Sequence, residues 1–478
     1  MAPLFDTHVQ QMKYIVLSEV AKLAFDGELT AVKLMELPKK IIPDGKPMFR
    51  CCIFKERAII GERISLALSG GEKDADVIAV LPIACDECPV DGIQVTDACR
   101  GCLAHRCKEN CPKDAISIVN HRAVIDKEKC VECGRCLSVC PYSAIVKRDR
   151  PCISACKAKA IQINSSTQKA TIDRDKCINC GACVYQCPFG AISDTSSITQ
   201  VISLLQESKN NTQYHVYAVI APAIASQYGK VSPEQVIGAI QALGFYEVVE
   251  AARGADMVAY EEAKELSEKG FLLSSCCPSF VEYAKKFPQA ASYISGNLSP
   301  MACISKWIKE QDPLARVVFI GPCIAKKAEV AATRAGDYVD YALTFEEMQA
   351  LFAAKSIDVT AAEKTASGNA SYYGRIFAKS GGLTAAVQQA LKEQGFEQFA
   401  VQPAICNGIA ECRTVLHKIK KGQLRENFVE GMACEGGCIG GPACLSHTVR
   451  NASQVDTYAQ SAAMQSITES VLPLRGDA

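Results

Sequence analysis

The sequence lacks the features that mark membrane, secreted and nucleic-acid-binding proteins. No apolar run approaches the roughly 18 residues that a membrane helix needs, and the first residues, MAPLFDTHVQQ, lack the basic and then apolar layout of a signal peptide. Lys+Arg and Asp+Glu both number 52, so no net charge draws the chain to nucleic acid or to an anionic membrane. No nicotinamide or flavin motif is visible. We therefore expect a cytoplasmic protein without nucleic-acid or membrane partners.

Cysteine, by contrast, is present in excess, with 27 in 478 residues. Disulfides do not persist in a reducing cytosol, and the spacing is not that of a secreted disulfide scaffold, so clustered Cys-x2-Cys patterns indicate metal. Sixteen of the cysteines lie between Cys85 and Cys187. We expect this stretch to hold iron or zinc.

The chain divides into three regions of different character. Residues 1–80 hold one cysteine pair, Cys51-Cys52, and residues 81–195 are expected to form a cysteine-rich, ferredoxin-like α+β domain. From residue 212 to 478 apolar strands alternate with helices, which is typical of an α/β fold with mostly parallel strands. Outside the cysteine repeats, the predicted strands are Val77–Ile83, His215–Ile220, Tyr246–Val249, Phe271–Leu273 and Val317–Ile320, and the predicted helices are His8–Phe25, Pro233–Leu243, Met257–Lys269 and Phe345–Ala354. The polar segment Ser193–Asn211 is expected to be a joining helix or linker.

The middle region repeats itself. CRGCLAHRCKENCPKDAI begins at Cys99, CVECGRCLSVCPYSAI at Cys130 and CINCGACVYQCPFGAI at Cys177, and a shortened copy, PCISACKAKAI, begins at Pro151. C-x2-C-x2-C-x3-C-P is the spacing with which bacterial ferredoxins bind 4Fe-4S clusters: three thiolates bind one cubane and the fourth binds its neighbour. Two complete copies make this signal specific, although an isolated Cys-x2-Cys could also bind zinc.

Crossing the fourth ligands between copies assigns three clusters. Cluster one takes Cys99, Cys102, Cys107 and Cys140; cluster two takes Cys130, Cys133, Cys136 and Cys111; cluster three takes Cys177, Cys180, Cys183 and Cys156. Cys85, Cys88, Cys152 and Cys187 remain. We expect them to form a fourth cubane, with the alternative that Cys85 and Cys88 are buried thiols or bind another metal. Three or four clusters in a row would carry electrons to or from a site elsewhere in the chain.

Three further cysteine motifs lie far apart in the last 210 or so residues. They are SSCCPSF from Ser274, GPCIAKKAEV from Gly321 and MACEGGCIGG from Met432. The first two follow predicted strands, where α/β folds place their sites, and the glycines of the third allow the backbone to approach a bulky group. Four cysteines from these loops could hold one more cluster. Adjacent side chains on an extended chain point in opposite directions, so Cys276 and Cys277 are expected to have different roles.

From about Tyr214 to its end the sequence resembles the iron-only (FeFe) hydrogenases, with the three motifs in the family's order. The resemblance implies a two-lobed α/β domain that holds the H-cluster. This is a cubane bridged by a cysteine sulfur to a two-iron unit with CO, cyanide and azadithiolate, which maturation proteins supply. By motif position, the cubane ligands would be Cys277, Cys323, Cys434 and Cys438, with Cys438 as the bridge. Lys326 would donate to a cyanide, and Pro222 and Met432 would line the pocket.

The resemblance also implies a relay for the protons that H2 chemistry consumes or releases. Cys276 would be the first acceptor, and Ser299, Glu262 and Glu265 would continue the path. The two glutamates lie three residues apart on a predicted helix, so they can share a face. Apart from the family, a solvated helix face would be the ordinary interpretation of these glutamates, and a cap or turn that of Ser299.

The implied activity is 2 H+ + 2 e− ⇌ H2, with ferredoxin or a similar small electron carrier as the partner. A hydrogen sensor is one alternative, for which an added signalling domain and loss of Cys276 would be expected. An iron–sulfur assembly protein of the same ancestry is another, and Lys326 and the Cys276-Cys277 pair argue against it.

Phe280 stands where tryptophan is frequent in the family, and Gly321 where many members have a methionine, which indicates a divergent subgroup. Cysteines that match no ligand position are expected to be small core residues. These are Cys51, Cys52, Cys303, Cys406, Cys412 and Cys444.

Overall fold

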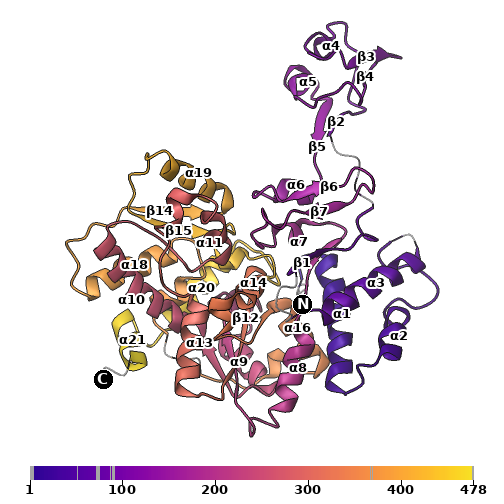
Figure 1. Cartoon of the computed structure of the whole chain (residues 1–478). Coiled ribbons are helices and arrows are strands. Elements are labelled where there is room, and N and C mark those ends of the chain that lie inside the picture. The colour runs from indigo at the N-terminus through magenta and orange to yellow at the C-terminus, as the bar shows by residue number, and fades with distance from the viewer. Residues whose placement is uncertain are drawn as a thin grey trace.

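The structure, a computed structural model, describes residues 5–50, 52–70, 76–86, 88, 92–366, 368 and 370–475. Three helices, α1 (His8–Phe25), α2 (Ala31–Ile41) and α3 (Ile53–Leu68), precede the cysteine repeats, and an α/β domain follows them (Figure 1). Cys51, which we expected in the core, lies outside the described residues. Across the described ranges, no helix combines the length and the apolar character needed to cross a membrane.

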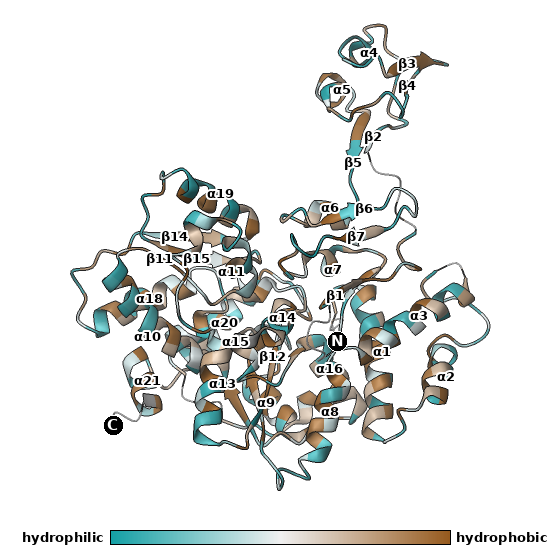
Figure 2. Ribbon diagram, viewed as in Figure 1, coloured by the Kyte–Doolittle hydropathy of each residue, from teal (hydrophilic) through white to brown (hydrophobic). Residues whose placement is uncertain are grey.

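Two parallel sheets form the frame of the α/β domain. One has the order β10–β9–β12–β13 and the other β11–β15–β14, and every printed pairing in both is parallel. Figure 2 shows hydrophobic residues along the strands of the first sheet and both colours on the helices around it, the pattern of amphipathic helices that cover a buried sheet. The strands are β9 (Val216–Ile220), β10 (Glu247–Glu250), β11 (Leu272–Leu273), β12 (Arg316–Gly321), β13 (Tyr341–Thr344), β14 (Pro403–Asn407) and β15 (Phe428–Met432).

The three helices predicted in this domain are present in the predicted order, but α10 is longer than expected and the structure contains further helices that were not predicted. Helix α10 spans Ala251–Lys269, whereas the prediction began at Met257, because its first turns are built from small residues without apolar periodicity. A Cβ at Gly254 would lie 2.0 Å from the Pro300 carbonyl oxygen of α13 (Pro300–Gln311), so the small residues let the two helices approach closely. The other helices that matter below are α8 (Ile198–Glu207) in the predicted linker, α9 (Pro233–Ala242), α11 (Pro278–Ala284), α14 (Ala325–Ala331) and α16 (Phe345–Ala354).

The cysteine repeats form two units with the same order of elements. The outer unit, residues 92–148, contains β2 (Gly92–Val95), α4 (Arg106–Glu109), β3 (Ile116–Val119), β4 (Arg122–Ile125), α5 (Arg135–Val139) and β5 (Ile145–Arg148). The inner unit, residues 76–88 and 149–194, contains β1 (Ile78–Val80), α6 (Pro151–Ala155), β6 (Ile161–Ile163), β7 (Ala170–Ile172), α7 (Ala182–Gln186) and β8 (Ile192–Asp194). In Figure 1 the outer unit extends away from the rest of the molecule, and its strands β2 and β5 lie at the end nearest the inner unit.

Buried charges join the N-terminal helices, the inner unit and the α/β domain. Lys13 of α1 binds Asp194, the last residue of β8, and also Glu346 of α16, with 2.6 Å from Nζ to Oε2. Lys327 Nζ lies 2.7 Å from Asp194 Oδ2 and 2.9 Å from Glu347 Oε2. Burial raises the pKa of Asp194, but Lys13 and Lys327 outweigh this effect, so the pKa is lowered. Removing one member of such a buried network typically costs about 3–5 kcal/mol of stability. The network therefore fixes the inner unit against the α/β domain.

Candidate active site

The carboxyl ends of the two parallel sheets face a common internal cavity. It contains about 880 Å³ of space not filled by protein atoms, part of it open to solvent, and its wall includes residues that follow β9, β11, β12 and β15. Strands that run in parallel end at the same edge of a sheet, which is why loops far apart in sequence meet here. Apart from thiols and the lysine of α14, the lining is almost entirely apolar. The cavity can therefore hold a sizeable group away from water.

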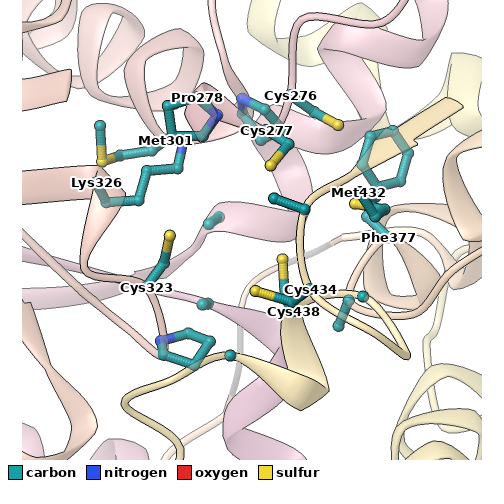
Figure 3. A pocket seen from close by; sticks show the side chains of 18 of the residues that line it. Cys276, Cys277, Pro278, Met301, Cys323, Lys326, Phe377, Met432, Cys434 and Cys438 are labelled. Carbon is teal, nitrogen blue, oxygen red and sulfur yellow. The ribbon is translucent and has the colours of Figure 1, made fainter. Parts of the chain in front are cut away.

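Four thiols from three loops face this space. The sulfur atoms of Cys277, Cys323, Cys434 and Cys438 point into the cavity (Figure 3). Burial raises the pKa of the Cys323 thiol to about 12 and that of Cys438 to about 11. Such thiols stay neutral until a metal displaces their protons. Their convergence on one apolar space fits a cysteine-bound cluster.

Among the described residues, no group of three or more His, Cys, Asp or Glu side chains could hold one metal ion. The ligands of one ion converge on a point, whereas the cysteines of a cubane stand around a larger group. The wall of this cavity suits the larger group.

The fifth thiol has a different orientation. The Cys276 sulfur turns away from the four and toward Met432 and Phe377 (Figure 3). The electrostatic neighbours of the Cys276 thiol include the carboxylate of Glu262 on α10. Glu262 Oε1 accepts hydrogen bonds from the Ser275 backbone N–H at 3.1 Å and from its hydroxyl at 3.2 Å. The predicted division between Cys276 and Cys277 thus has a geometric counterpart.

Glu262 is fully buried, and this burial raises its pKa to about 7. Its Oε2 atom accepts no hydrogen bond from any described residue. A buried carboxyl with one free oxygen and a pKa near neutrality can both take up and release a proton. This environment differs from the solvated helix face that the sequence alone would have given it.

Glu265 lies one turn further along α10 and reaches the surface. Its Oε2 atom accepts hydrogen bonds from the Ser295 hydroxyl and the Asn297 side-chain amide, both at 2.9 Å. Lys269 Nζ lies 2.6 Å from its Oε1 atom. Burial raises the pKa of Glu265, but Lys269 and the neighbouring hydrogen bonds outweigh burial and lower it. Glu265 is therefore a carboxylate at the outer end of a chain of polar groups.

The hydroxyl groups beside the glutamates are not the one that we predicted. Ser299 caps α13, where its Oγ accepts the Ala302 N–H at 3.5 Å. Ser275 and Ser295 make the hydrogen bonds to the two glutamates instead. A serine followed by proline is a helix-start signal, so the capping position of Ser299 was readable. Ser295 precedes Gly296 in a turn, and no sequence pattern pointed to a contact with Glu265. A relay role for Ser299 stays a prediction that these hydrogen bonds do not support.

The remaining predicted pocket residues line the cavity. Pro222, Met432 and Lys326 all form part of its wall. Lys326 Nζ pairs with Glu329 Oε2 at 2.6 Å, a partner one turn away on α14 that we did not predict. A Cβ at Gly321 would lie 2.6 Å from Phe319 Cζ. The Phe319 ring therefore fills part of the wall next to the position where many relatives carry methionine.

Known families match both halves of this architecture. Residues 214–442 match the family described as iron only hydrogenase large subunit, C-terminal domain, and residues 123–146 and 170–193 match the 4Fe-4S binding domain. The α/β part of this chain is therefore similar to the large-subunit domain of iron-only hydrogenases. We use the name hydrogenase domain for this part below.

Two curated hydrogenases align over much of the chain. Iron hydrogenase 1 of Clostridium pasteurianum is 26% identical over 391 residues, which cover 69% of this chain and 66% of that protein, just under two thirds of its length. The Periplasmic [Fe] hydrogenase large subunit of Nitratidesulfovibrio vulgaris is 27% identical over 382 residues, or 67% of this chain and 86% of that one. Among solved structures, a variant of [FeFe]-hydrogenase HydA1 from Chlamydomonas reinhardtii superposes with a TM-score of 0.47 at 21% identity, covering 59% of this chain and 94% of that one.

Upstream of the hydrogenase domain, the two units bring the repeat cysteines together in the predicted groups. Cys99, Cys102, Cys107 and Cys140 line one small cavity of the outer unit, and Cys111, Cys130, Cys133 and Cys136 line another. In the inner unit, the electrostatic neighbours of Cys183 include Cys156, Cys177 and Cys180, and those of Cys152 are Cys187, Cys88 and Cys85. Iron binding by each group stays a prediction, and this grouping supports it.

The inner unit touches the hydrogenase cavity directly. Cys180, a predicted ligand of cluster three, forms part of the cavity wall. The next residue, Gly181, has a φ of 76°, and a Cβ there would lie 2.7 Å from Ile324 Cδ1 and from Pro442 Cγ. The absence of a side chain therefore allows the loop of cluster three to lie against the loop that follows Cys323.

The other cysteines have structural positions. Cys406, Cys412 and Cys444 are fully buried in the hydrogenase domain. Cys303 is half-buried in α13, and Cys52 is half-buried at the start of α3. Core packing, which we expected, fits the three fully buried ones best.

Proposed function

We propose that the chain is a hydrogenase that catalyses 2 H+ + 2 e− ⇌ H2 at an H-cluster held in the cavity. The observation that carries this proposal is the arrangement of five thiols in the wall of one largely apolar cavity: four point into it, and the fifth, Cys276, turns away from them and interacts electrostatically with the buried Glu262. The similarity to curated iron hydrogenases supports it. When bound, the H-cluster would supply the iron centre at which H2 is formed or split.

The chain's own residues would hold and enclose this group. Cys277, Cys323, Cys434 and Cys438 would be the cubane ligands, and maturation proteins would supply the two-iron unit. Lys326 places a buried ammonium on the cavity wall, where it can donate to an anionic ligand such as cyanide. Pro222 and Met432 add apolar surface that keeps water out.

Protons would leave or enter through α10. The Cys276 thiol would exchange a proton with Glu262, whose pKa near 7 suits it to both directions of transfer at neutral pH. Ser295, in place of Ser299, would provide the hydroxyl between Glu262 and Glu265. Glu265 would pass the proton to solvent.

Electrons would reach the cavity through cluster three and enter at the outer unit. Residues 92–148 contain ten Lys or Arg and six Asp or Glu residues, although the whole chain is balanced. Leu103, 98% exposed, and Tyr142, 52% exposed, adjoin the cluster-one cysteines Cys102 and Cys140 in sequence. An apolar patch surrounded by basic residues fits a small acidic electron carrier such as a ferredoxin. The enzyme and this carrier would both be located in the cytoplasm.

Two substitutions at neighbouring positions test the proposal. In anaerobically matured protein, Cys277→Ala should lose the H-cluster and all turnover, because a ligand is missing. Cys276→Ala should keep the cluster and lose most H2 turnover, because only the proton path is cut. Cys303→Ala is the matched control and should behave like the wild type. Equal behaviour of the first two variants would contradict the division of roles, and absence of H2 turnover in the matured wild type would contradict the function.

A further inference from the structure

The inner unit has the complete set of ferredoxin elements but a shortened cysteine repeat. Strand β1 pairs with β8 in the inner unit as β2 pairs with β5 in the outer unit, and both pairings are antiparallel. The hairpins β6–β7 and β3–β4 also correspond, as do α6 with α4 and α7 with α5. The outer unit lies between Cys88 and α6 in the chain, so one ferredoxin-like unit is inserted into the other.

Hydrogen bonds to sulfur match between the units one by one. In the outer unit, Cys99 accepts the Ala123 N–H at 3.4 Å, Cys111 accepts that of Ala115 at 3.3 Å and Cys140 accepts that of Ala144 at 3.4 Å. In the inner unit, Cys85 accepts the Ala170 N–H at 3.4 Å, Cys156 accepts that of Ala160 at 3.2 Å and Cys187 accepts that of Ala191 at 3.2 Å. Ala123 and Ala170 both lie seven residues before the first cysteine of a complete repeat. Cys85 therefore occupies in the inner unit the place of the cluster-one ligand Cys99.

The backbone repeats in the same way. Asp114 and Lys159, each three residues after a fourth-position cysteine, both adopt a positive φ, of 46° and 55°. Gly134 and Gly181, in the complete repeats, have φ values of 79° and 76°. Positive φ at equivalent positions is sterically restricted, so the agreement reflects one loop design used twice. The design is that of a cubane-binding loop.

The four thiols left over by the first three clusters are close together and mostly buried. Cys85, Cys152 and Cys187 are each 6% exposed and belong to one hydrophobic cluster. Cys187, Cys88 and Cys85 are also the thiols that interact electrostatically with Cys152. The group corresponds to the cluster-one ligands of the outer unit. The pair Cys85 and Cys88 corresponds to Cys99 and Cys102, Cys152 corresponds to Cys107, and Cys187 corresponds to Cys140.

We propose that Cys85, Cys88, Cys152 and Cys187 bind a fourth accessory 4Fe-4S cluster. The inner unit is then a complete two-cluster ferredoxin whose first ligand pair is separated from the rest by an inserted second ferredoxin. This inference rests on the ferredoxin-like units and does not depend on the hydrogen chemistry proposed above.

The position of this cluster gives it a role in electron transfer. Cys88 lies five residues before Ile93, which lines the cluster-two cavity of the outer unit. Five residues span at most about 18 Å, so Cys88 lies within about 18 Å of this cavity wall. Cys152 is also a neighbour of the cluster-three ligand Cys183. The fourth cluster connects the outer unit to cluster three, and cluster three connects to the cavity.

Iron content of the full-length protein, made without the two-iron unit, tests the proposal. The double variant Cys85→Ser, Cys88→Ser should contain about four irons fewer per chain than the wild type. The equivalent outer-unit variant, Cys99→Ser, Cys102→Ser, should lose the same amount, and Cys303→Ser should lose none. Spin quantitation by EPR after reduction should show the loss of one cluster in each double variant. Unchanged iron in a folded Cys85→Ser, Cys88→Ser protein would overturn the proposal.

A single substitution covers the case in which the double variant does not fold. Cys88→Ser leaves three thiols and an oxygen donor, so one cluster should keep its iron and change its EPR signal, while the signals of the other clusters stay as they are. An EPR spectrum identical to that of the wild type would overturn the proposal. If the matured wild type had no H2 turnover but the double variants still lost iron as predicted, the fourth cluster would be supported and the proposed function would be contradicted.

Discussion

The proposed electron side and the proposed proton side of the cavity are built in different ways. On the electron side, short cysteine repeats fold into two similar units, and one of them places Cys180 in the cavity wall. On the proposed proton side, Ser275 donates a hydrogen bond to Glu262 and Ser295 donates one to Glu265, and the two serines come from separate loops.

The contrast follows from what each particle needs. An electron can cross protein between clusters that are near each other, so a repeated loop and an inserted unit are sufficient. A proton needs donors and acceptors within hydrogen-bond reach at every step. The electron side therefore tolerates modular construction, whereas the proton side depends on the tertiary fold.

The largest effect is expected on the proton side, from Glu262→Gln. The amide keeps an acceptor for Ser275 but cannot exchange a proton as a carboxyl does, so dye-linked H2 turnover should fall by about 100-fold. EPR signals of the accessory clusters should not change. Glu268→Gln, at an exposed position of the same helix, is the control and should retain full turnover. Equal turnover in Glu262→Gln and the wild type would show that protons take another route.

The same variant gives a pH test of the Glu262 environment. Burial raises the pKa from 4.5 to about 7, so the folded wild type should show an infrared band of a protonated carboxyl that disappears as the pH rises through about 7. Because the folded state binds this proton more tightly than the unfolded state, the wild type loses stability between about pH 4.5 and 7. Glu262→Gln should therefore lack the band and melt at a higher temperature than the wild type at pH 8. A lower melting temperature at pH 8 would contradict the buried-carboxyl account.

An intermediate effect is expected at the electron entry. Reversing two exposed charges beside Cys107, with Arg106→Glu and Lys108→Glu, should slow ferredoxin-linked turnover by about 10-fold at low salt, and less at high salt. Turnover with a small artificial donor should not change. The control, Lys157→Glu and Lys159→Glu, makes the same charge change on exposed residues of the inner unit. A similar loss in the control would place the docking surface elsewhere.

The smallest effect compares two equivalent glycines. Gly134 and Gly181 share a positive φ, but a Cβ at Gly134 meets nothing within 4 Å, whereas one at Gly181 would contact Ile324 and Pro442. Gly134→Ala should cost about 1 kcal/mol of stability through backbone strain. Gly181→Ala should cost about 1–3 kcal/mol more through overpacking. Electron transfer from reduced cluster three to the H-cluster in the cavity should also slow a few-fold. Equal costs, measured by denaturant unfolding, would contradict the close contact between the units.

The electron side could be predicted from the sequence in detail. The crossed assignment of ligands followed from Cys-x2-Cys spacing alone, and the structure brings those groups together, including Cys152 beside Cys187, Cys88 and Cys85. Four strands and three helices of the hydrogenase domain were also predicted, because apolar strands and amphipathic helices have local signatures, but β13, β14, β15 and most of the other helices were not. The insertion of the outer unit was not predicted, because it is visible only once β1 is seen to pair with β8.

The proton side was predicted less well. The family resemblance pointed to Glu262 and Glu265, but the serine beside them is Ser295 and the expected Ser299 is a helix cap. The pairing of Lys326 with Glu329 was missed, although the two lie at a spacing that favours contact on a helix. The contact of Ser295 with Glu265 joins segments that are distant in sequence and leaves no local signature, whereas the Ser299 cap and the Lys326–Glu329 pair had local signatures that were overlooked.

The most direct test of the account is infrared spectroscopy of the anaerobically matured protein. The account predicts CO and cyanide stretching bands in the wild type, their retention in Cys276→Ala and their loss in Cys277→Ala. Absence of these bands in the wild type, with the maturation proteins present and the accessory clusters intact, would contradict the claim that the cavity holds an H-cluster.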